Sequence, residues 1–407
     1  MRMRKVAAAA LSFILVTGFA SPVSADLVRD KQYWFEQYGF TQAWQLSRGE
    51  GVTIAIVDTG IDATHPSLQG AVIGGIDMSG LGTPNGQTPV GANPYHGTMV
   101  ASLAAGRGDR DGGDTGVLGT APMAQILSVS IAFGVEELDT DSQIAEGIIW
   151  AVDNGAKVIN LSLTRNSVSW PKSWDRAFLY AFENDVVIVA AVGNRGDGTE
   201  QVSAPATIPG VISVAGLDIE GNASQSFSTS GLSIGVTAPS EDLVAAYPGG
   251  EYRVWSGTSG SAPIVSGMVA LIRSRYPELD AANVVNRVIS SARKIGFNSY
   301  STSFGHGVID AQKALQADIP LVTSNPLGSL EQWIELYRQD APAEITPGKI
   351  VSPIKAPIVE LEQTQPWFSN VSNWLPLAGY AGLGLLAIFM YFAFRPSGQS
   401  PARVKRK

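Results

Sequence analysis

The chain has 407 residues, of which 45% are hydrophobic and 16% charged, with no cysteine and a formal charge of −8. This length allows two or three domains, or one large domain with extensions. The lack of cysteine excludes disulfides, thiolate metal sites and cysteine nucleophiles. Both ends are basic, so the acidic residues all lie in the body between them. Such an acidic body is not expected to bind nucleic acid, because affinity for phosphates comes from cationic side chains.

The start of the chain has the composition of a secretory signal peptide. The basic segment MRMRK precedes the apolar stretch VAAAALSFILVTGFA, and VSA then supplies small residues at the −3 and −1 positions of a cleavage site. An uncleaved N-terminal anchor is the alternative. We expect a signal peptide over residues 1–25, followed by an N-terminal extension over residues 26–47.

Residues 48–316 alternate short runs rich in Val and Ile with longer helical patterns. Runs of this kind suit strands that are buried on both faces of a parallel sheet. The alternation predicts an α/β fold with a mainly parallel central sheet and right-handed crossovers. The expected strands are 51–58, 125–132, 157–163, 185–193 and 210–218. The expected helices are 96–105, 142–154, 173–184, 259–276, 281–293 and 309–316.

The C-terminal part predicts a membrane attachment. Residues 317–373 are rich in proline and suggest a stalk, with one short helix expected over residues 329–338. Residues 374–394 contain no charge and are numerous enough to cross a hydrocarbon core of about 30 Å. The basic tail, residues 395–407, then belongs in the cytoplasm by the positive-inside rule, and the body belongs outside. A buried core helix is the alternative to the span.

Three short motifs carry candidate chemistry. Asp58 lies in DTG after the first strand, His96 lies in HGT at a helix start, and Ser259 lies in GTS at another helix start. Each motif alone is weak, and DTG also occurs in aspartic proteases. Together they predict nucleophilic catalysis, because a serine hydroxyl needs a neighbouring base and the base needs an orienting carboxylate. His96 would take and return the proton, and Asp58 would fix the imidazole tautomer.

An oxyanion site is expected beside these motifs. At a helix start, the backbone N–H of Ser259 lies where the helix dipole is positive. Asn194 follows a buried strand and a glycine in AAVGN, and its amide could donate a second hydrogen bond to the oxyanion. The alternative is that Asn194 is an ordinary turn residue. Its role as an oxyanion donor is favoured only because the other three motifs are also present.

About two thirds of the chain resembles the subtilisin-like serine proteases, or subtilases. The resemblance rests on VDTGID, HGTMVASLAAG, LGTAP, VINLSL, AAVGN, PATIPGVISVAG and GTSGSAPIVSG. It implies a three-layer α/β/α fold, with Asp58, His96 and Ser259 as catalytic residues and Asn194 in the oxyanion hole. It also implies that an edge strand pairs with the substrate backbone and that a pocket opposite it takes a small or apolar side chain. The residues so implied are Leu161, Ser162 and Leu163 for the edge strand, and Ala191, Val192 and Gly193 for the pocket.

The family's calcium site is not expected here. Where family members carry HPDL with a ligating Asp, this chain has Ser67, and Gly113 stands in place of a ligating Asn. With both oxygen ligands gone the site should be absent. Asp109, Asp111 and Asp114 form an acidic loop that resembles a calcium-binding loop, but no bidentate Glu follows at a fixed position, so a solvated turn is the favoured interpretation. We therefore predict no metal and no cofactor.

The flanking segments resemble those of the mycosins, which are membrane-anchored subtilases of type VII secretion systems. Only a short extension precedes the first strand, with no room for a folding prodomain, and a proline-rich stalk and a span follow the body. The resemblance implies a membrane-anchored extracytoplasmic serine endopeptidase with protein or peptide substrates and a secretion complex as partner. The rival functions are a structural subunit with dispensable protease activity, and an aspartic protease, which would need a second DTG loop.

Overall fold

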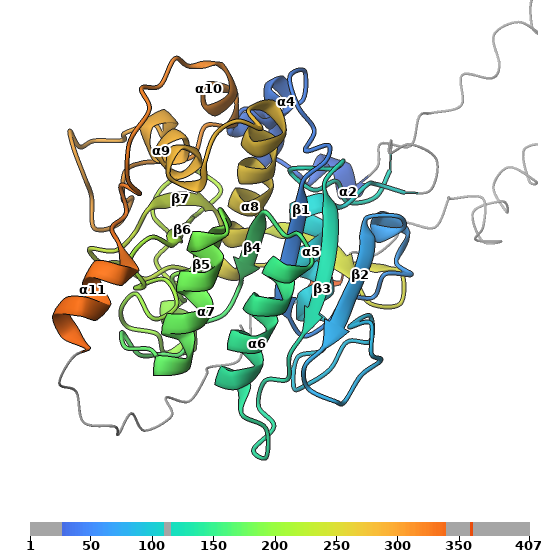
Figure 1. Ribbon diagram of the computed structural model, residues 1–407. Helices are drawn as coiled ribbons and strands as arrows, with labels where there is room; N and C mark the ends of the chain where they lie inside the picture. Colours follow the sequence, from blue (N-terminus) through green and yellow to red (C-terminus); the bar gives the residue numbers. More distant parts are fainter. Residues whose placement is uncertain (1–26, 110–114, 339–358, 361–407) are drawn as a thin grey trace, which may run out of the picture. The chain divides into compact units, whose positions relative to one another are not determined.

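A computed structural model describes residues 27–109 and 115–338, together with the backbone of residues 359–360 (Figure 1). The predicted signal peptide, membrane span and basic tail lie outside the described residues, as do Asp111 and Asp114. Among the described helices, none combines the length and apolar character needed to cross a membrane.

The core is a parallel sheet of seven strands in the order β2-β3-β1-β4-β5-β6-β7. The strands are β1 (Thr53–Asp58), β2 (Val72–Asp77), β3 (Gln125–Ser130), β4 (Val158–Leu161), β5 (Val187–Ala191), β6 (Ile212–Leu217) and β7 (Val236–Pro239). All residues of β4, β5, β6 and β7 are buried. Helices therefore cover both faces, which explains why these strands read as continuous apolar runs. The predicted α/β class and the five expected strands are confirmed.

One face of the sheet carries α6 (Thr140–Asp153) and α7 (Lys172–Glu183), which pack on each other in the main apolar cluster (Figure 1). The other face carries α5 (His96–Ala105) and α8 (Thr258–Arg275), and α8 contacts β4, β5, β6 and β7. All of α5 and nearly all of α8 are buried, so neither shows a polar face. At the far end of α8, Arg273 bonds to Asp185 at 2.7 Å.

The remaining helices are short or peripheral. They are α2 (Leu27–Asp30), α3 (Trp34–Gln37), α4 (Phe40–Ala43), α9 (Ala281–Ser291), α10 (Ala311–Gln316), α11 (Leu330–Tyr337) and the 3₁₀ turns η1 (Pro66–Leu68) and η2 (Arg195–Asp197). Several helices begin at side chains that accept from the first free N–H groups, as for Asp139 before α6 and Asp280 before α9. The seven helices expected from the sequence are all present, with ends that differ by at most a few residues.

A smaller antiparallel sheet lies beside the main one. The hairpin of β8 (Leu243–Tyr247) and β9 (Glu251–Trp255) is extended by β10 (Val359–Glu360), which pairs antiparallel with β9. The hairpin immediately precedes the turn that leads into α8, so it helps to fix the start of that helix.

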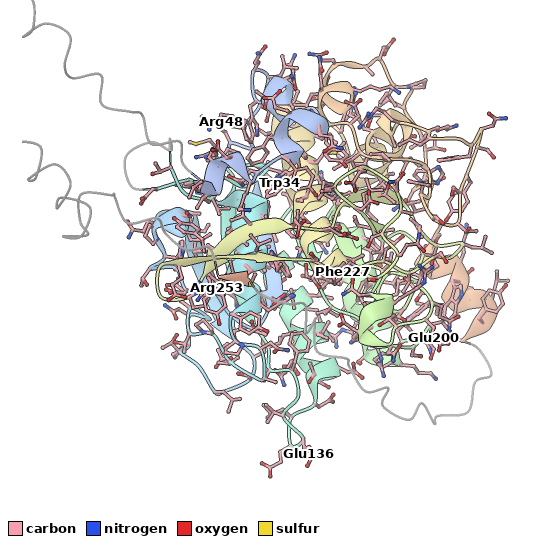
Figure 2. All side chains as sticks on the ribbon, turned by 180° about the vertical axis from the view of Figure 1, so that it is seen from behind. Trp34, Arg48, Glu136, Glu200, Phe227 and Arg253 are labelled. Carbon is pink, nitrogen blue, oxygen red and sulfur yellow. The ribbon has the colours of Figure 1, made fainter. Side chains whose placement is uncertain are left out.

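The N-terminal extension packs on the body through its aromatic residues. Trp34 and Phe40 are fully buried, and Figure 2 shows Trp34 where the first helices meet the body. Gln32 exchanges two hydrogen bonds with the backbone of Leu118, and Trp44 Nε1 donates to the carbonyl oxygen of Thr120 at 2.9 Å. Figure 1 shows α4 beside α10, on the side of the sheet away from the arrowheads of β2 and β3. This part of the extension therefore lies away from the carboxyl ends of the strands.

The predicted start of the stalk at residue 317 needs correction, because residues 317–338 pack against the body. Asn283 on α9 exchanges hydrogen bonds with Val322, and Asn286 donates to the carbonyl oxygen of Pro320 at 2.8 Å. Leu330 at the start of α11 is 1% exposed. Proline content predicts an extended chain, but it does not prevent backbone groups of that chain from pairing with asparagine side chains.

Candidate active site

Asp58 and His96 form a direct pair at the carboxyl end of the sheet. Asp58 is the last residue of β1 and His96 the first of α5, and both side chains are 1% exposed. The Nδ1 atom of His96 lies 2.9 Å from each carboxylate oxygen of Asp58. With Nδ1–H donated to the carboxylate, the second ring nitrogen, Nε2, is left as an acceptor.

Glycine and threonine hold the two loops of this pair together. A Cβ atom at Gly97 would lie 2.3 Å from the carbonyl oxygen of Gly60, a distance that leaves no room for a side chain. The backbone N–H of Gly97 donates to Thr59 Oγ1, and Thr98 Oγ1 accepts from the N–H of Asp62, both at 2.9 Å. The DTG and HGT motifs therefore contact each other directly, through backbone and threonine side-chain atoms.

Trp255, at the end of β9, packs against one side of the His96 imidazole. Its ring meets the ring of His96 edge-on, with 5.4 Å between the ring centroids. The same indole lies 3.5 Å from the point that a Cβ of Gly260 would occupy, one residue after Ser259. Trp255 thus lies close to both the histidine and the start of α8. No sequence motif pointed to it.

Ser259 is the second residue of α8, and its side chain faces the end of β4. Its Oγ donates to the carbonyl oxygen of Ser162 at 3.2 Å, and Ser162 Oγ donates to the carbonyl oxygen of Ser259 at 2.8 Å. His96 Nε2 is buried and has no hydrogen-bond partner among the described residues. The structure therefore forms the Asp58–His96 bond but holds the serine hydroxyl on Ser162 rather than on the imidazole.

Asn194 follows β5 and is tied to the first residue of α8. Its Oδ1 accepts from the backbone N–H of Thr258 at 2.9 Å and from Thr258 Oγ1 at 3.0 Å. Its Nδ2 donates to Asp197 Oδ2 at 3.0 Å. Thr258 Oγ1 also accepts from the N–H of Gly193 at 3.2 Å. Sequence reasoning assigned no role to Thr258 or Asp197, although both lie within three residues of a motif position.

The prediction of an edge strand at Leu161, Ser162 and Leu163 is wrong as stated. Leu161 is the last residue of β4, which lies between β1 and β5, and it pairs with Ala190. All three residues are buried. A short apolar run has the same composition whether its strand is interior or at an edge, so the sequence could not distinguish the two. The binding of substrate along Ser162 and Leu163 stays a prediction.

The residues predicted to form the pocket wall are buried, and Gly193 lies close to the methyl groups of two threonines. Ala191 and Val192 are at most 1% exposed. Gly193 has φ +101°, and a Cβ there would lie 2.6 Å from Thr199 Cγ2 and 3.4 Å from Thr164 Cγ2. The assignment of these residues to substrate binding also stays a prediction.

No cluster of three His, Asp or Glu side chains that could hold a metal ion occurs in the described ranges. Ser67 stands where a ligating Asp was expected from the family resemblance. Its Oγ is hydrogen-bonded to the hydroxyl of Tyr252 at 3.0 Å and accepts from the N–H of Val117 at 3.1 Å. His65 is fully buried, with Nε2 2.9 Å from the carbonyl oxygen of Glu251 and Nδ1 accepting from the N–H of Ser67. These residues serve to connect the loop after β1 with the β8–β9 hairpin.

Comparison with known proteins agrees with this arrangement. Residues 49–307 match the subtilase family, peptidase S8. Thermitase from Thermoactinomyces vulgaris is 37% identical over 286 residues, which cover 70% of this chain and 96% of thermitase. The structure of MycP1 with its N-terminal propeptide removed is 28% identical with a TM-score of 0.60, covering 71% of this chain and 99% of that chain. The MycP3 protease from the type VII (ESX-3) secretion system is 31% identical with a TM-score of 0.59, over 70% of this chain and 88% of that chain. The chain therefore belongs to the subtilase family and is a serine endopeptidase.

Proposed function

We propose that the protein hydrolyses peptide bonds through an acyl-enzyme, with Ser259 as nucleophile, His96 as general base and Asp58 as the group that orients the imidazole. The observation that carries this proposal is the bond from His96 Nδ1 to both oxygens of Asp58 at 2.9 Å. That bond fixes the tautomer in which Nε2, which is buried and has no hydrogen-bond partner within the described part of the chain, can accept a proton.

The reaction begins with a rotation of the Ser259 side chain. Its hydroxyl leaves the carbonyl oxygen of Ser162 and donates to His96 Nε2. As Oγ bonds to the peptide carbonyl carbon, its proton passes to Nε2 and the carbonyl electrons move onto oxygen. His96 then gives the proton to the leaving amine as the C–N bond breaks. Water, deprotonated by the same nitrogen, releases the acyl group and restores the serine.

The oxyanion would be stabilised from two sides. The N–H of Ser259 lies in the first turn of α8, where backbone N–H groups have no partner within the helix and the dipole is positive. The second N–H of the Asn194 amide, the one not donated to Asp197, supplies the other hydrogen bond. Aligned donors of this kind act on charge as it develops in the transition state.

The aspartic-protease alternative is disfavoured by the same geometry. A catalytic aspartate of that class shares a proton with a second carboxylate, whereas both oxygens of Asp58 contact His96. Pepstatin should leave hydrolysis unchanged.

The substitution Ser259→Ala tests the nucleophile. It should abolish both peptide hydrolysis and labelling by a fluorophosphonate, whereas Ser290→Ala, at an exposed position near the end of α9, should leave both unchanged. Labelling that survives in the Ser259→Ala protein would overturn the assignment.

We further propose that the protease is anchored in the cell membrane by residues 374–394, with its catalytic domain outside and its tail in the cytoplasm. The likeness to MycP1 and MycP3 supports a role in a type VII-like secretion system. Carbonate-resistant membrane association that is lost when residues 374–407 are deleted would support the anchor. The rival role is a structural subunit with dispensable protease activity, and rescue of a secretion defect by the Ser259→Ala protein would favour that role.

A further inference from the structure

We propose that Asp197 is a positioning residue that sets the orientation of the Asn194 amide in the oxyanion site. The inference rests on the proposed acyl-enzyme mechanism and adds a residue to it. Asp197 acts through Asn194 and does not itself touch the substrate.

The hydrogen bonds of the amide carry the proposal. A primary amide offers two lone pairs on oxygen and two N–H groups. Both lone pairs of Asn194 are used by Thr258, at 2.9 and 3.0 Å, and one N–H is used by Asp197 at 3.0 Å. One N–H remains, and its direction is fixed by the other three bonds. That N–H is the donor available to an oxyanion.

The two ends of the amide need different partners to prevent a flip. Thr258 presents its backbone N–H, a donor, so the oxygen of Asn194 must face it. An ionised carboxylate can accept hydrogen bonds but cannot donate them, so Asp197 must face the nitrogen of the amide. Turning the amide by half a revolution would place donor against donor on one side and oxygen against oxygen on the other. Thr258 and Asp197 thus exclude the flipped amide from both sides.

The local backbone explains why these two side chains meet. Residues Arg195–Asp197 form the 3₁₀ turn η2, and the N–H of Asp197 donates to the carbonyl oxygen of Asn194 at 3.2 Å. In a 3₁₀ turn the side chains three residues apart lie over one another. Gly198 then leaves the turn with φ +82°, a conformation that suits glycine.

The negative charge of Asp197 opposes its effect as an acceptor. A carboxylate near the oxyanion raises the energy of the developing negative charge, whereas the hydrogen bond from Asn194 holds the donor in place. The two effects can be separated by substitution. Asp197→Asn keeps an oxygen that can accept from Asn194 and removes the charge. Asp197→Ala removes both.

The experiment measures kcat and KM on a peptide substrate for the full chain and its variants. Asp197→Ala should lower kcat about 10-fold with KM within about twofold, because a misaligned donor loses part of the roughly 10²–10³-fold effect of an oxyanion donor. Asp197→Asn should restore kcat to within about twofold of the wild type. Glu200→Ala, at an exposed position in the same loop (Figure 2), is the control and should leave both constants unchanged.

A double-mutant cycle then tests whether Asp197 acts through Asn194. In the Asn194→Ala background, Asp197→Ala should cause no further loss. The inference is overturned if Asp197→Ala has the wild-type kcat, if Asp197→Asn is as slow as Asp197→Ala, or if the losses at the two positions multiply. Hydrolysis that survives Ser259→Ala would instead refute the mechanism itself, so the two failures are distinct. A thermal melt of each variant shows whether it has folded.

Discussion

Arg338, one residue after α11, forms a salt bridge with Asp175 on α7, with 2.9 Å between Nε and Oδ2. The side chains are only 10% and 14% exposed, and the guanidinium lies over the rings of Trp170 and Trp333 at 5.5 and 5.2 Å. This cluster fastens the last described helix to the catalytic body.

Replacing Arg338 by Met should loosen α11 without unfolding the core. The substitution leaves the mostly buried Asp175 without its cation. This costs about 3 kcal/mol, the low end of the range for breaking a buried ion pair, because Asp175 keeps the hydrogen bond from Trp170 Nε1. Hydrogen exchange should accelerate in residues 330–337 and stay unchanged in β4 and β5. Glu335→Ala, at an exposed position of the same helix, is the control. Unchanged exchange in α11 would show that the cluster does not hold the helix.

Gly97→Ala should impair both stability and catalysis. Its Cβ would overlap the carbonyl oxygen of Gly60, so the loops that carry His96 and Asp58 must separate. We expect a loss of about 1–3 kcal/mol in the free energy of unfolding and a fall in kcat of about 10²-fold, since a shift of about 1 Å can have that effect. In Gly74→Ala, the matched control, the Cβ would meet Leu127 at an ordinary 3.6 Å. Equal kcat values in the two variants would contradict the prediction.

Asp58→Asn should reduce kcat by about 10⁴-fold while leaving the fold intact, the size known for the same change in another serine protease. An asparagine that turns its NH₂ toward Nδ1 would force the histidine into the opposite tautomer, with the proton on Nε2. Nε2 could then no longer accept the proton of Ser259. Asp153→Asn, at an exposed position of α6, should keep full activity. The measurement is steady-state hydrolysis at neutral pH.

His65 should make the protein less stable in mild acid. Burial lowers the pKa of His65 below its usual 6.5, against smaller raising effects of the Glu251 carbonyl and of Asp62 and Asp109. The unfolded chain therefore binds a proton near pH 6.5 that the folded chain does not yet bind. Stability is complete above that pH and falls as the pH drops below it, by up to about 1.4 kcal/mol per pH unit.

Denaturation midpoints at pH 7.5 and 5.0 check this expectation. His65→Gln should flatten the change between the two pH values, even though the variant is less stable at both. His306 is half-buried and its pKa is also lowered, first by burial and then by Lys294, so His306→Gln should flatten it less. A wild-type slope that persists in His65→Gln would assign the acid sensitivity elsewhere.

The sequence predicted the central sheet well because buried parallel strands and their helices have simple patterns. Five strands and seven helices were expected where they occur, whereas β2 and β7 were not. Strand β2 contains Gly74 and Gly75 and is mostly half-buried, and β7 ends in Pro239, so neither has the composition of a buried strand. The docking of residues 317–338 also escaped prediction, because it depends on asparagine side chains of α9 far away in the sequence.

For the site, the sequence could name residue types but not their bonds. The glycines of DTG and HGT mark the close approach of two loops, which is a local requirement and therefore visible in motifs. Asp197 lies in an RGDG turn that is typical of a solvated loop, and only the fold shows that it contacts Asn194. The bond between Ser259 and Ser162, and the indole of Trp255 against His96, also depend on segments that are distant in sequence.

Helix α8 presents Ser259 at one end and is fixed by Arg273 at the other. Nearly every residue between them is buried, and the helix contacts the five strands β1, β4, β5, β6 and β7. The reactive hydroxyl thus belongs to the same continuous helix that packs in the core, and no loop separates the two. Heating should therefore not produce a folded but inactive enzyme. The loss of activity and the unfolding of the protein should show the same dependence on temperature.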